Sequence, residues 1–204
     1  AQNSQEFVQT VKKQTGMNVN VISGEEEARL IRVGIWDAFP KTKEAFLFID
    51  IGGGSTELSV SSRSDIQVLE SLNVGCVMVT DAHRASRAGK VGAVTFEKMQ
   101  AYALRKMQHA LAEIQKCSFR AAVASSGTAQ SLLGFVQSKR GNDKPLPVCA
   151  EGTILPYDEL ESAAKALCQM TLEQRRNQAA MSPSRAEVIV GGAAILLQLM
   201  KALK

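Results

Sequence analysis

The chain has 204 residues, of which 45% are hydrophobic and 22% charged, enough apolar material for a sizeable core and too much for a disordered chain. Aromatic residues make up only 5%, which disfavours a base-stacking nucleic-acid surface, and two histidines exclude a histidine-rich metal site. No apolar run approaches the ~18 residues of a membrane-spanning helix. The dispersed net charge of +4 indicates a solvated surface or a field that attracts anions.

Four widely separated cysteines form no CxxC pair, which disfavours zinc and, without a secretory signal, favours reduced thiols in a cytoplasmic protein. The chain opens AQNSQEF, without Met, and we expect it to begin inside a fold, as a fragment would. The expected partners therefore include neither a nucleic acid nor a membrane.

The first 43 residues predict a helix, a short strand and a second helix. Residues 4–15 carry a small helical apolar face, and 19–22 read as a strand. Ser23 is a candidate N-cap of the second helix, with Glu26 three residues later as a capping box requires. Three acids in that first turn suit the positive end of the helix dipole. Residues 34–43 are expected to be a loop.

An antiparallel meander of three strands is predicted next. Residues 45–51 form a nearly continuous apolar run, typical of a buried central strand. Three glycines interrupt the pattern, and 55–61 then alternate apolar and polar side chains, as a half-buried strand does. After a turn, 66–72 complete the meander.

The rest of the chain predicts mainly helices with two more buried strands. Thr95 is the candidate N-cap of a helix over 95–116, on which His109 falls outside the apolar stripe and is expected to be exposed. The further elements expected in chain order are a strand at 119–124, a helix at 129–139, a loop at 141–147, a helix after Pro156, a helix at 171–178, and a strand at 188–190 leading into a helix at 193–203.

The glycine-rich turn between the first two meander strands is the strongest chemical feature. Asp50 ends one strand and Glu57 lies early in the next, so two carboxylates flank the turn. Glycines bring backbone N–H groups to one point, and such a nest of donors binds oxyanions. Acids beside a phosphate site repel phosphate unless a cation lies between them, and Mg²⁺ prefers such oxygen ligands. The alternative is an ordinary glycine-rich hairpin.

Two further junctions from strand to helix are candidate anion sites. Residues 125–128 place small hydroxyl side chains at a helix N-terminus, which suits phosphate or merely caps the helix. Gly191 and Gly192 stand at the predicted junction before the last helix, where they admit a phosphate chain or close helix packing. Capping needs at most one of the acids at 25–27, so another could act as a general base on water.

Four segments of the chain, in this order, resemble the successive signatures of the exopolyphosphatase and guanosine pentaphosphate phosphohydrolase (Ppx/GppA) family. They are NVISGEEEARL at 20–30, IDIGGGSTEL at 49–58, ASSGT at 124–128 and IVGGA at 189–193. The resemblance implies an α/β, ribonuclease H-like lobe of the actin, sugar-kinase and Hsp70 superfamily, with a central mixed sheet flanked by helices. It also implies Mg²⁺-dependent hydrolysis of a phosphoanhydride bond at the end of polyphosphate or of a guanosine tetra- or pentaphosphate.

The resemblance also assigns the site residues. Glu27 matches the base that activates the attacking water, and Asp50 and Glu57 match the acids assigned to the metal and water. Arg29 matches an arginine that makes an ion pair or a phosphate contact. The residues expected to bind phosphate are Gly52, Gly53, Gly54, Ser55, Thr56, Ser126, Gly127, Thr128, Gly191 and Gly192.

The family's first phosphate loop, of DxGS type, is absent from the sequence. Residues 1–43 are therefore expected to be the end of a first lobe and 44–204 a second lobe, with a homodimer forming in the full-length protein. We expect this polypeptide alone to be a weak hydrolase. Two alternatives remain: a non-catalytic module that binds polyphosphate or alarmones, which the retained acids disfavour, and an ATP-dependent kinase, which the glutamate-rich first motif disfavours.

Overall fold

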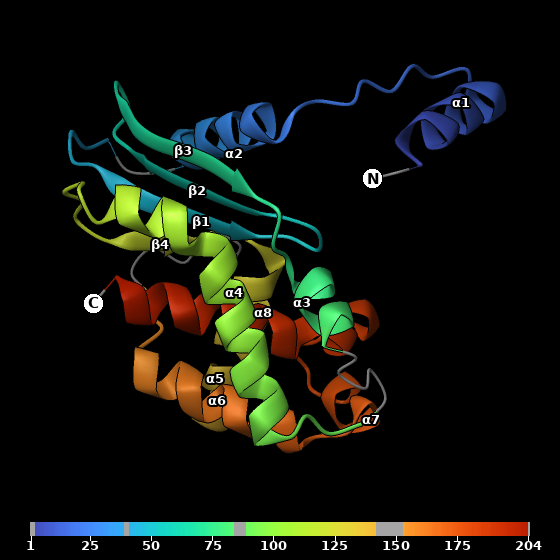
Figure 1. Cartoon of the computed structure of the whole chain (residues 1–204), viewed down its shortest axis with the longest axis vertical. Coiled ribbons are helices and arrows are strands. Elements are labelled where there is room, and N and C mark those ends of the chain that lie inside the picture. Colours follow the sequence, from blue (N-terminus) through green and yellow to red (C-terminus); the bar gives the residue numbers. More distant parts are fainter. Residues whose placement is uncertain (1–2, 39–40, 84–88, 142–152, 204) are drawn as a thin grey trace.

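A computed structural model describes residues 3–38, 41–83, 89–141 and 153–203 (Figure 1). The elements are, in chain order, α1 (Ser4–Thr15), α2 (Gly24–Ala38), β1 (Phe46–Ile51), β2 (Thr56–Ser61), β3 (Ile66–Leu72), α3 (Cys76–Ala82), α4 (Ala93–Ile114), β4 (Ala122–Ala124), α5 (Gly127–Lys139), α6 (Tyr157–Gln169), α7 (Leu172–Arg176) and α8 (Pro183–Ala202). Within these ranges, no helix is both long enough and apolar enough to cross a membrane.

The four strands form one mixed sheet in the order β3-β2-β1-β4. The meander is confirmed, since β2 pairs antiparallel with both β1 and β3, and β4 adds a parallel strand beside β1. The helix α2 covers one face of the sheet, while α4, α8 and the remaining helices of the second part lie on the other (Figure 1). The α/β fold with a mixed sheet flanked by helices is as the sequence predicts.

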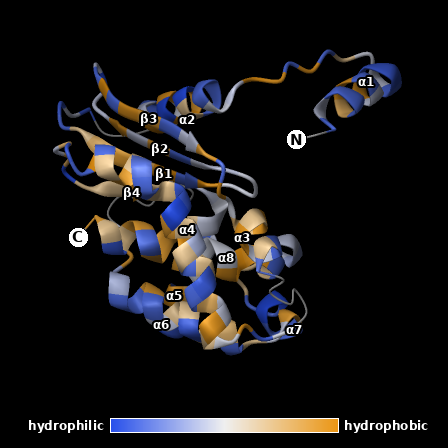
Figure 2. Cartoon of the chain, in the orientation of Figure 1, coloured by the Kyte–Doolittle hydropathy of each residue, from blue (hydrophilic) through white to orange (hydrophobic). Residues whose placement is uncertain are grey.

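Alternation along β1 and β2 sends side chains to both faces, and both faces are covered. Leu47, Ile49 and Leu58 enter the large core that α4 and α8 complete, while Phe46 and Phe48 pack beneath α2. Figure 2 shows that α8, between the sheet and α5 and α6, is mostly hydrophobic, as a helix surrounded by other elements must be. Consequently β2, which the sequence predicts to be half-buried, is buried along its whole length.

The first part of the chain differs from expectation in two places. The helix at 4–15 forms, but none of its residues is buried, and it stands apart from the sheet (Figure 1). The strand predicted at 19–22 does not form, because no neighbouring strand within the described residues offers it hydrogen bonds. The predicted loop at 34–43 is wrong at its start. There α2 continues through Trp36, whose indole N–H donates to Ser61 Oγ at 3.2 Å.

Two helices and one strand also depart from the predictions. The short helix α3 was not anticipated. Gly92 rather than Thr95 caps α4, so that helix begins two residues early. The predicted strand at 119–124 shortens to β4, and the predicted loop at 141–147 lies almost entirely outside the described residues.

The strand predicted at 188–190 is wrong, because those residues lie inside the continuous helix α8. An ideal Cβ on Gly191 would lie 2.5 Å from the carbonyl oxygen of Cys76, and one on Gly192 would lie 2.3 Å from Cγ2 of Thr128. The two glycines therefore let α3 and the start of α5 approach the backbone of α8. An apolar run of β-branched residues and glycines is equally typical of a buried strand and a buried helix, which explains the error.

We predict that Gly191→Ala lowers the free energy of unfolding by about 1–3 kcal/mol, because the added methyl group overlaps a backbone carbonyl of α3. The matched control is Gly34→Ala within α2, where an added Cβ meets nothing within 4 Å. That change should raise stability by roughly 0.5–1 kcal/mol through helix propensity alone. Urea unfolding of both variants measures the contrast, and equal effects would refute the packing role of Gly191.

Candidate active site

Two carboxylates face each other directly across the first two strands. Asp50 of β1 and Glu57 of β2 are register partners in the antiparallel ladder, on the sheet face that α2 covers. Burial raises the pKa of both groups, and each is raised further by negative charge from its surroundings, including Glu27 in both cases. Opposed like charges destabilise a sheet. This pair is therefore what a cation-dependent site needs and what a purely structural hairpin avoids.

Serine hydroxyl groups support the two carboxylates. Ser125, just after β4, donates to Asp50 Oδ2 at 3.3 Å, and Ser71 of β3 donates to Glu57 Oε1 at 2.9 Å. Ser55, at the end of the glycine turn, also hydrogen-bonds to Glu57. These bonds lower the pKa of both acids, but less than burial raises it. The polar contacts hold the carboxylates in place without neutralising their charge.

An open pocket of about 470 Å³ lies beside this pair. Gly24 and Glu25 at the start of α2 line one part of it, and Ser55 and Ser71, the hydroxyl partners of Glu57, line another. The pocket thus borders Ser55 at the end of the glycine turn and the first turn of α2, while Asp50 and Glu57 line a separate, much smaller hollow beneath α2. This is space in which a substrate could meet the acids of α2.

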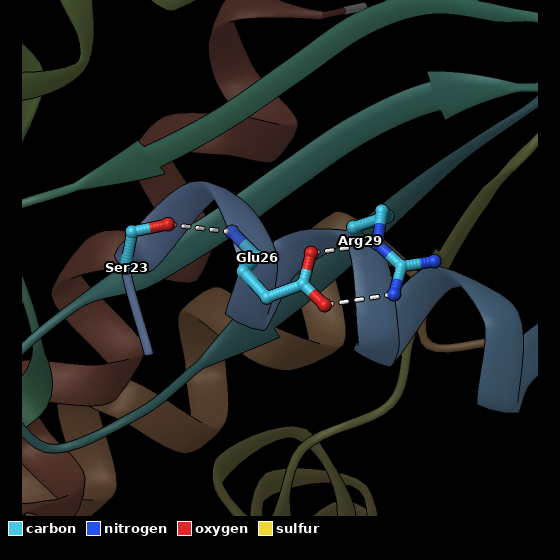
Figure 3. Close-up of polar contacts among 3 residues, drawn as sticks. All are labelled: Ser23, Glu26 and Arg29. Carbon is cyan, nitrogen blue, oxygen red and sulfur yellow. Dashed lines mark hydrogen bonds and ion pairs between the residues drawn. The ribbon is translucent and has the colours of Figure 1, made fainter. Parts of the chain in front are cut away.

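In the first turn of α2, the glutamates Glu26 and Glu27 have different surroundings, and Figure 3 shows those of Glu26. Ser23 accepts a hydrogen bond from the backbone N–H of Glu26 at 3.1 Å, which confirms the predicted N-cap. The Glu26 carboxylate does not return to Ser23, however, but makes two 2.7 Å hydrogen bonds with the Arg29 guanidinium. Glu27, one residue on, exerts its charge on both Asp50 and Glu57. The structure thus holds Arg29 in an ion pair with Glu26, while the charge of the exposed Glu27 adds to burial in raising the pKa of both sheet acids.

The glycine turn is anchored by α3. The backbone N–H groups of Cys76 and Val77 donate to the carbonyl oxygens of Gly52 and Gly53 at 3.0 Å each. Only glycine fits at Gly75, where an ideal Cβ would lie 2.3 Å from the Gly53 carbonyl oxygen. The helix therefore draws the carbonyls of the turn toward the protein.

Within the turn itself, a Cβ on Gly52 would lie 3.3 Å from the carbonyl oxygen of Ser55, but Gly54 has no such steric need. None of residues 52–54 has a positive φ, and an added Cβ at Gly54 would meet nothing within 4 Å. Neither backbone conformation nor packing thus requires glycine at Gly54. A bare backbone there leaves room for a ligand to approach closely, which is the remaining common use of glycine.

Three hydroxyl groups expected to contact phosphate are engaged by the protein instead. Thr56 is fully buried and donates to the carbonyl of Val74 at 2.5 Å. Thr128, also fully buried, donates to the carbonyl of Ile51 at 2.8 Å, and Ser126 accepts from the N–H of Ala129 as the N-cap of α5. These side chains tie the glycine turn and the start of α5 to the sheet. The exposed Gly127 remains the part of this second turn that a phosphate could reach.

The predicted phosphate contact of Gly191 and Gly192 is corrected by the structure. Their predicted phosphate contact rested on a junction from strand to helix, and no such junction exists within α8. Both glycines are buried in the helix against α3 and α5. The two glycines are not accessible to a ligand. They instead position α3, which holds the glycine turn, and the start of α5, where groups that could bind phosphate lie.

Arg185 is the functional candidate that sequence reasoning missed. It lies in the first turn of α8, and its Nη1 donates to Thr128 Oγ1 at 2.8 Å. Its Nη2 lies over Gly127, 2.8 Å from where a Cβ would be, and its charge acts on Asp50. The guanidinium is therefore bonded to the second turn, and its positive charge acts to lower the pKa of Asp50. Arg185 stands alone in the segment SPSRAEV, which matches no motif. Its place beside Gly127 and Thr128 follows only from how α8 packs, so the sequence could not indicate it.

The acids fit Mg²⁺ better than a metal with many protein ligands. Within the described ranges, no three acidic, histidine or cysteine side chains gather closely enough to hold a metal by themselves. Magnesium usually binds one or two carboxylates and completes its shell with water and phosphate oxygens. Asp50 and Glu57, two opposed acids beside an open pocket, match that donor set.

Comparison with known proteins gives a consistent result. The model of the Ppx/GppA phosphatase family matches residues 1–204. A guanosine-5'-triphosphate,3'-diphosphate pyrophosphatase of Aeromonas hydrophila is 28% identical over the whole chain, which spans 38% of that relative's length.

Solved structures show the same fold. An exopolyphosphatase from Cytophaga hutchinsonii has a TM-score of 0.83 at 23% identity, over 99% of this chain and 64% of that one. A Ppx/GppA family member from Aquifex aeolicus has a TM-score of 0.76 at 22% identity, over 100% and 63% of the two chains. These neighbours confirm the expected actin-like fold.

We predict that Asp50→Asn stabilises the protein by roughly 0.5–1 kcal/mol at neutral pH, because it removes a buried like-charge pair. The raised pKa of Asp50 makes the folded state bind protons more readily than the unfolded state. Ionisation therefore reduces stability as pH rises above the ordinary value of 3.8. The gain should disappear below that pH, and Mg²⁺ should raise the melting temperature of the wild type more than that of the variant. Thermal melts across pH measure both effects, and an equal Mg²⁺ shift would contradict the assignment.

Proposed function

Because the chain belongs to the Ppx/GppA phosphatase family, we propose that it hydrolyses the terminal phosphoanhydride bond of inorganic polyphosphate or of a guanosine tetra- or pentaphosphate. The observation that carries this proposal is the placement of Asp50 and Glu57 as direct register partners, with Glu27 acting on both. Three acids beside a glycine turn suit water activation next to a phosphoryl group. They would only repel a polyanion in a simple binding protein, which disfavours the non-catalytic alternative.

The chemistry is in-line attack by water on the terminal phosphorus. Glu27 orients the water and takes its proton as the new P–O bond forms. The bridging P–O bond breaks, and the shortened chain leaves with the bridging oxygen. We assign this role to Glu27 rather than to Glu26, because the Glu26 carboxylate is held by Arg29, which lowers the pKa of Glu26.

Asp50 and Glu57 would hold Mg²⁺, which when bound offsets the charge that develops on the phosphoryl oxygens. The chain's own contribution is to keep both carboxylates aligned, through Ser125 and Ser71. The bare backbone at Gly54 leaves a phosphate group space beside the turn. We place the terminal phosphate there.

Arg185 would stabilise the substrate at the second turn. Its guanidinium already lies over Gly127, at the N-terminus of α5, where backbone N–H groups and the helix dipole favour an anion. An arginine in this position can donate to phosphate oxygens while remaining charged. We propose that it binds a phosphate next to the one that is cleaved.

The chain spans only part of the length of its relatives, and this bears on how active it is alone. It covers 38% of the curated relative, and we propose that these 204 residues alone hydrolyse polyphosphate slowly. Phosphate release at ordinary enzyme rates by the purified chain would contradict this. The assignment of residues 1–43 and 44–204 to two lobes, the homodimer and the cytoplasmic location stay predictions.

We predict that Glu27→Gln lowers phosphate release from polyphosphate by about 10²–10⁴-fold, because the amide cannot accept the proton of the attacking water. Binding of polyphosphate, followed by calorimetry, should change little. Glu26→Gln is the matched control and should retain hydrolysis, since that carboxylate is occupied by Arg29. The opposite pattern would reassign the base to Glu26.

We predict that Arg185→Gln weakens substrate binding about tenfold, as expected for the loss of a charge-assisted hydrogen bond. It also removes the positive charge that lowers the pKa of Asp50, so the acid limb of the pH–rate profile should move to higher pH. Arg176→Gln, which removes an exposed ion pair with Glu187, serves as the control. An unchanged KM and an unchanged acid limb in the Arg185 variant would refute its role.

A further inference from the structure

The exposed face of α4 carries a row of basic side chains that the proposed hydrolysis does not use. Lys98, Arg105, Lys106 and His109 are exposed around the half-buried Tyr102, and together these five residues are called the α4 stripe. At 3.6 residues per turn, all but Lys106 fall within about 60° of one another around the helix. The row from Lys98 to His109 is about 16 Å long.

Carboxylates do not neutralise the centre of the α4 stripe. Some exposed cations elsewhere pair with acids, as Lys165 does with Glu161, whereas others, such as Lys12 and Lys43, make no ion pair within the described residues. Arg105 and Lys106 instead lie over the Tyr102 ring, 5.5 and 5.8 Å from its centroid, and neither makes an ion pair within the described residues. On α4 itself, Glu113 is held by Lys116 and also interacts with His109 at one end of the α4 stripe, and the exposed Glu97 precedes Lys98 at the other end. The α4 stripe thus keeps its positive charge available to an external anion.

The α4 stripe is connected to the glycine turn by α3. The N-terminus of α3 binds the carbonyls of Gly52 and Gly53, and its C-cap, His83, contacts the Tyr102 ring edge-on with centroids 5.3 Å apart. The seven residues of α3 span about 10 Å. A linear substrate whose end lies at the turn therefore has a cationic surface roughly one short helix away.

We propose that the α4 stripe binds the internal phosphates of a long inorganic polyphosphate chain whose terminal phosphate lies at the glycine turn. This rests on the proposed function and deepens it, because a compact guanosine pentaphosphate would leave most of the α4 stripe without a contact. The longer polyanion is thereby the favoured substrate.

Two other polyanionic partners fit the α4 stripe less well. A nucleic acid would need an open aromatic face for stacking, but His83, Arg105 and Lys106 already surround the Tyr102 ring. An acidic protein would need an apolar centre to its interface, and the α4 stripe contains no aliphatic side chain. A flexible chain of phosphates needs only the row of charges.

The test compares binding of long-chain polyphosphate and of tripolyphosphate to three forms of the chain. These are the wild type, the double variant Arg105→Gln/Lys106→Gln, and the control Lys41→Gln/Lys43→Gln. Glutamine preserves helix propensity on α4, and the control removes the same charge before the first residue of β1, the opposite end of that strand from Asp50. Circular dichroism verifies that each form is folded.

The double variant should bind long-chain polyphosphate about tenfold more weakly, and the slope of log affinity against log salt should fall by about two. Its affinity for tripolyphosphate should not change, and the control should behave as the wild type. Unchanged long-chain affinity, or an equal loss for both lengths, would overturn the role of the α4 stripe while leaving the proposed function standing.

Two further outcomes keep the inferences separate. If the wild type binds neither phosphate chain, the proposed substrate class fails, and the role of the α4 stripe fails with it. If single-stranded RNA or polyglutamate binds as tightly as polyphosphate, with the same loss in the double variant, the α4 stripe belongs to that partner and our inference is wrong.

Discussion

Two negative charges, Asp50 and Glu57, are fixed opposite each other by the hydrogen-bond ladder of β1 and β2, and the arrangement around them accommodates this repulsion. The ladder prevents the carboxylates from separating, and α2 prevents water from surrounding them fully. Hydroxyl groups from β3 and from the end of β4 supply hydrogen bonds in compensation. A sheet selected for stability alone would place a neutral pair here, so the pair is best understood as a demand of function.

The close packing of α8 is what brings the other groups to this pair. Because Gly191 and Gly192 lack side chains, the helix backbone meets α3 and the start of α5 directly. This contact fixes the position of the glycine turn, which α3 holds, and of Arg185, which stands six residues, or about 1.7 turns, before Gly191 on the same helix. The buried glycines of α8 thus set the spacing between two candidate phosphate positions, and the exposed start of the same helix supplies Arg185 to one of them.

The sequence predicted most of the features that local patterns determine. The meander followed from alternation and glycine breaks, and the acid pair followed from its place on either side of the turn. The sequence patterns gave wrong predictions where contacts between distant parts of the chain determine the secondary structure. Residues 19–22 have strand propensity but no neighbouring strand, α2 is prolonged by the burial of Trp36 against the sheet, and residues 188–190 join a helix because all their sides are covered. Arg185 could not be found at all, since nothing around it in the sequence records which turn it will contact.

The attachment of the glycine turn to α3 has a thermodynamic consequence for ligand binding. A glycine-rich segment loses much backbone entropy when it becomes ordered, and in many anion-binding loops part of the ligand's affinity offsets that loss. Here the bonds from Cys76 and Val77 order the turn within the protein itself. Under the proposed function, weak attraction for a single phosphate group would then suffice for binding, and a shortened product would dissociate without the loop having to unfold.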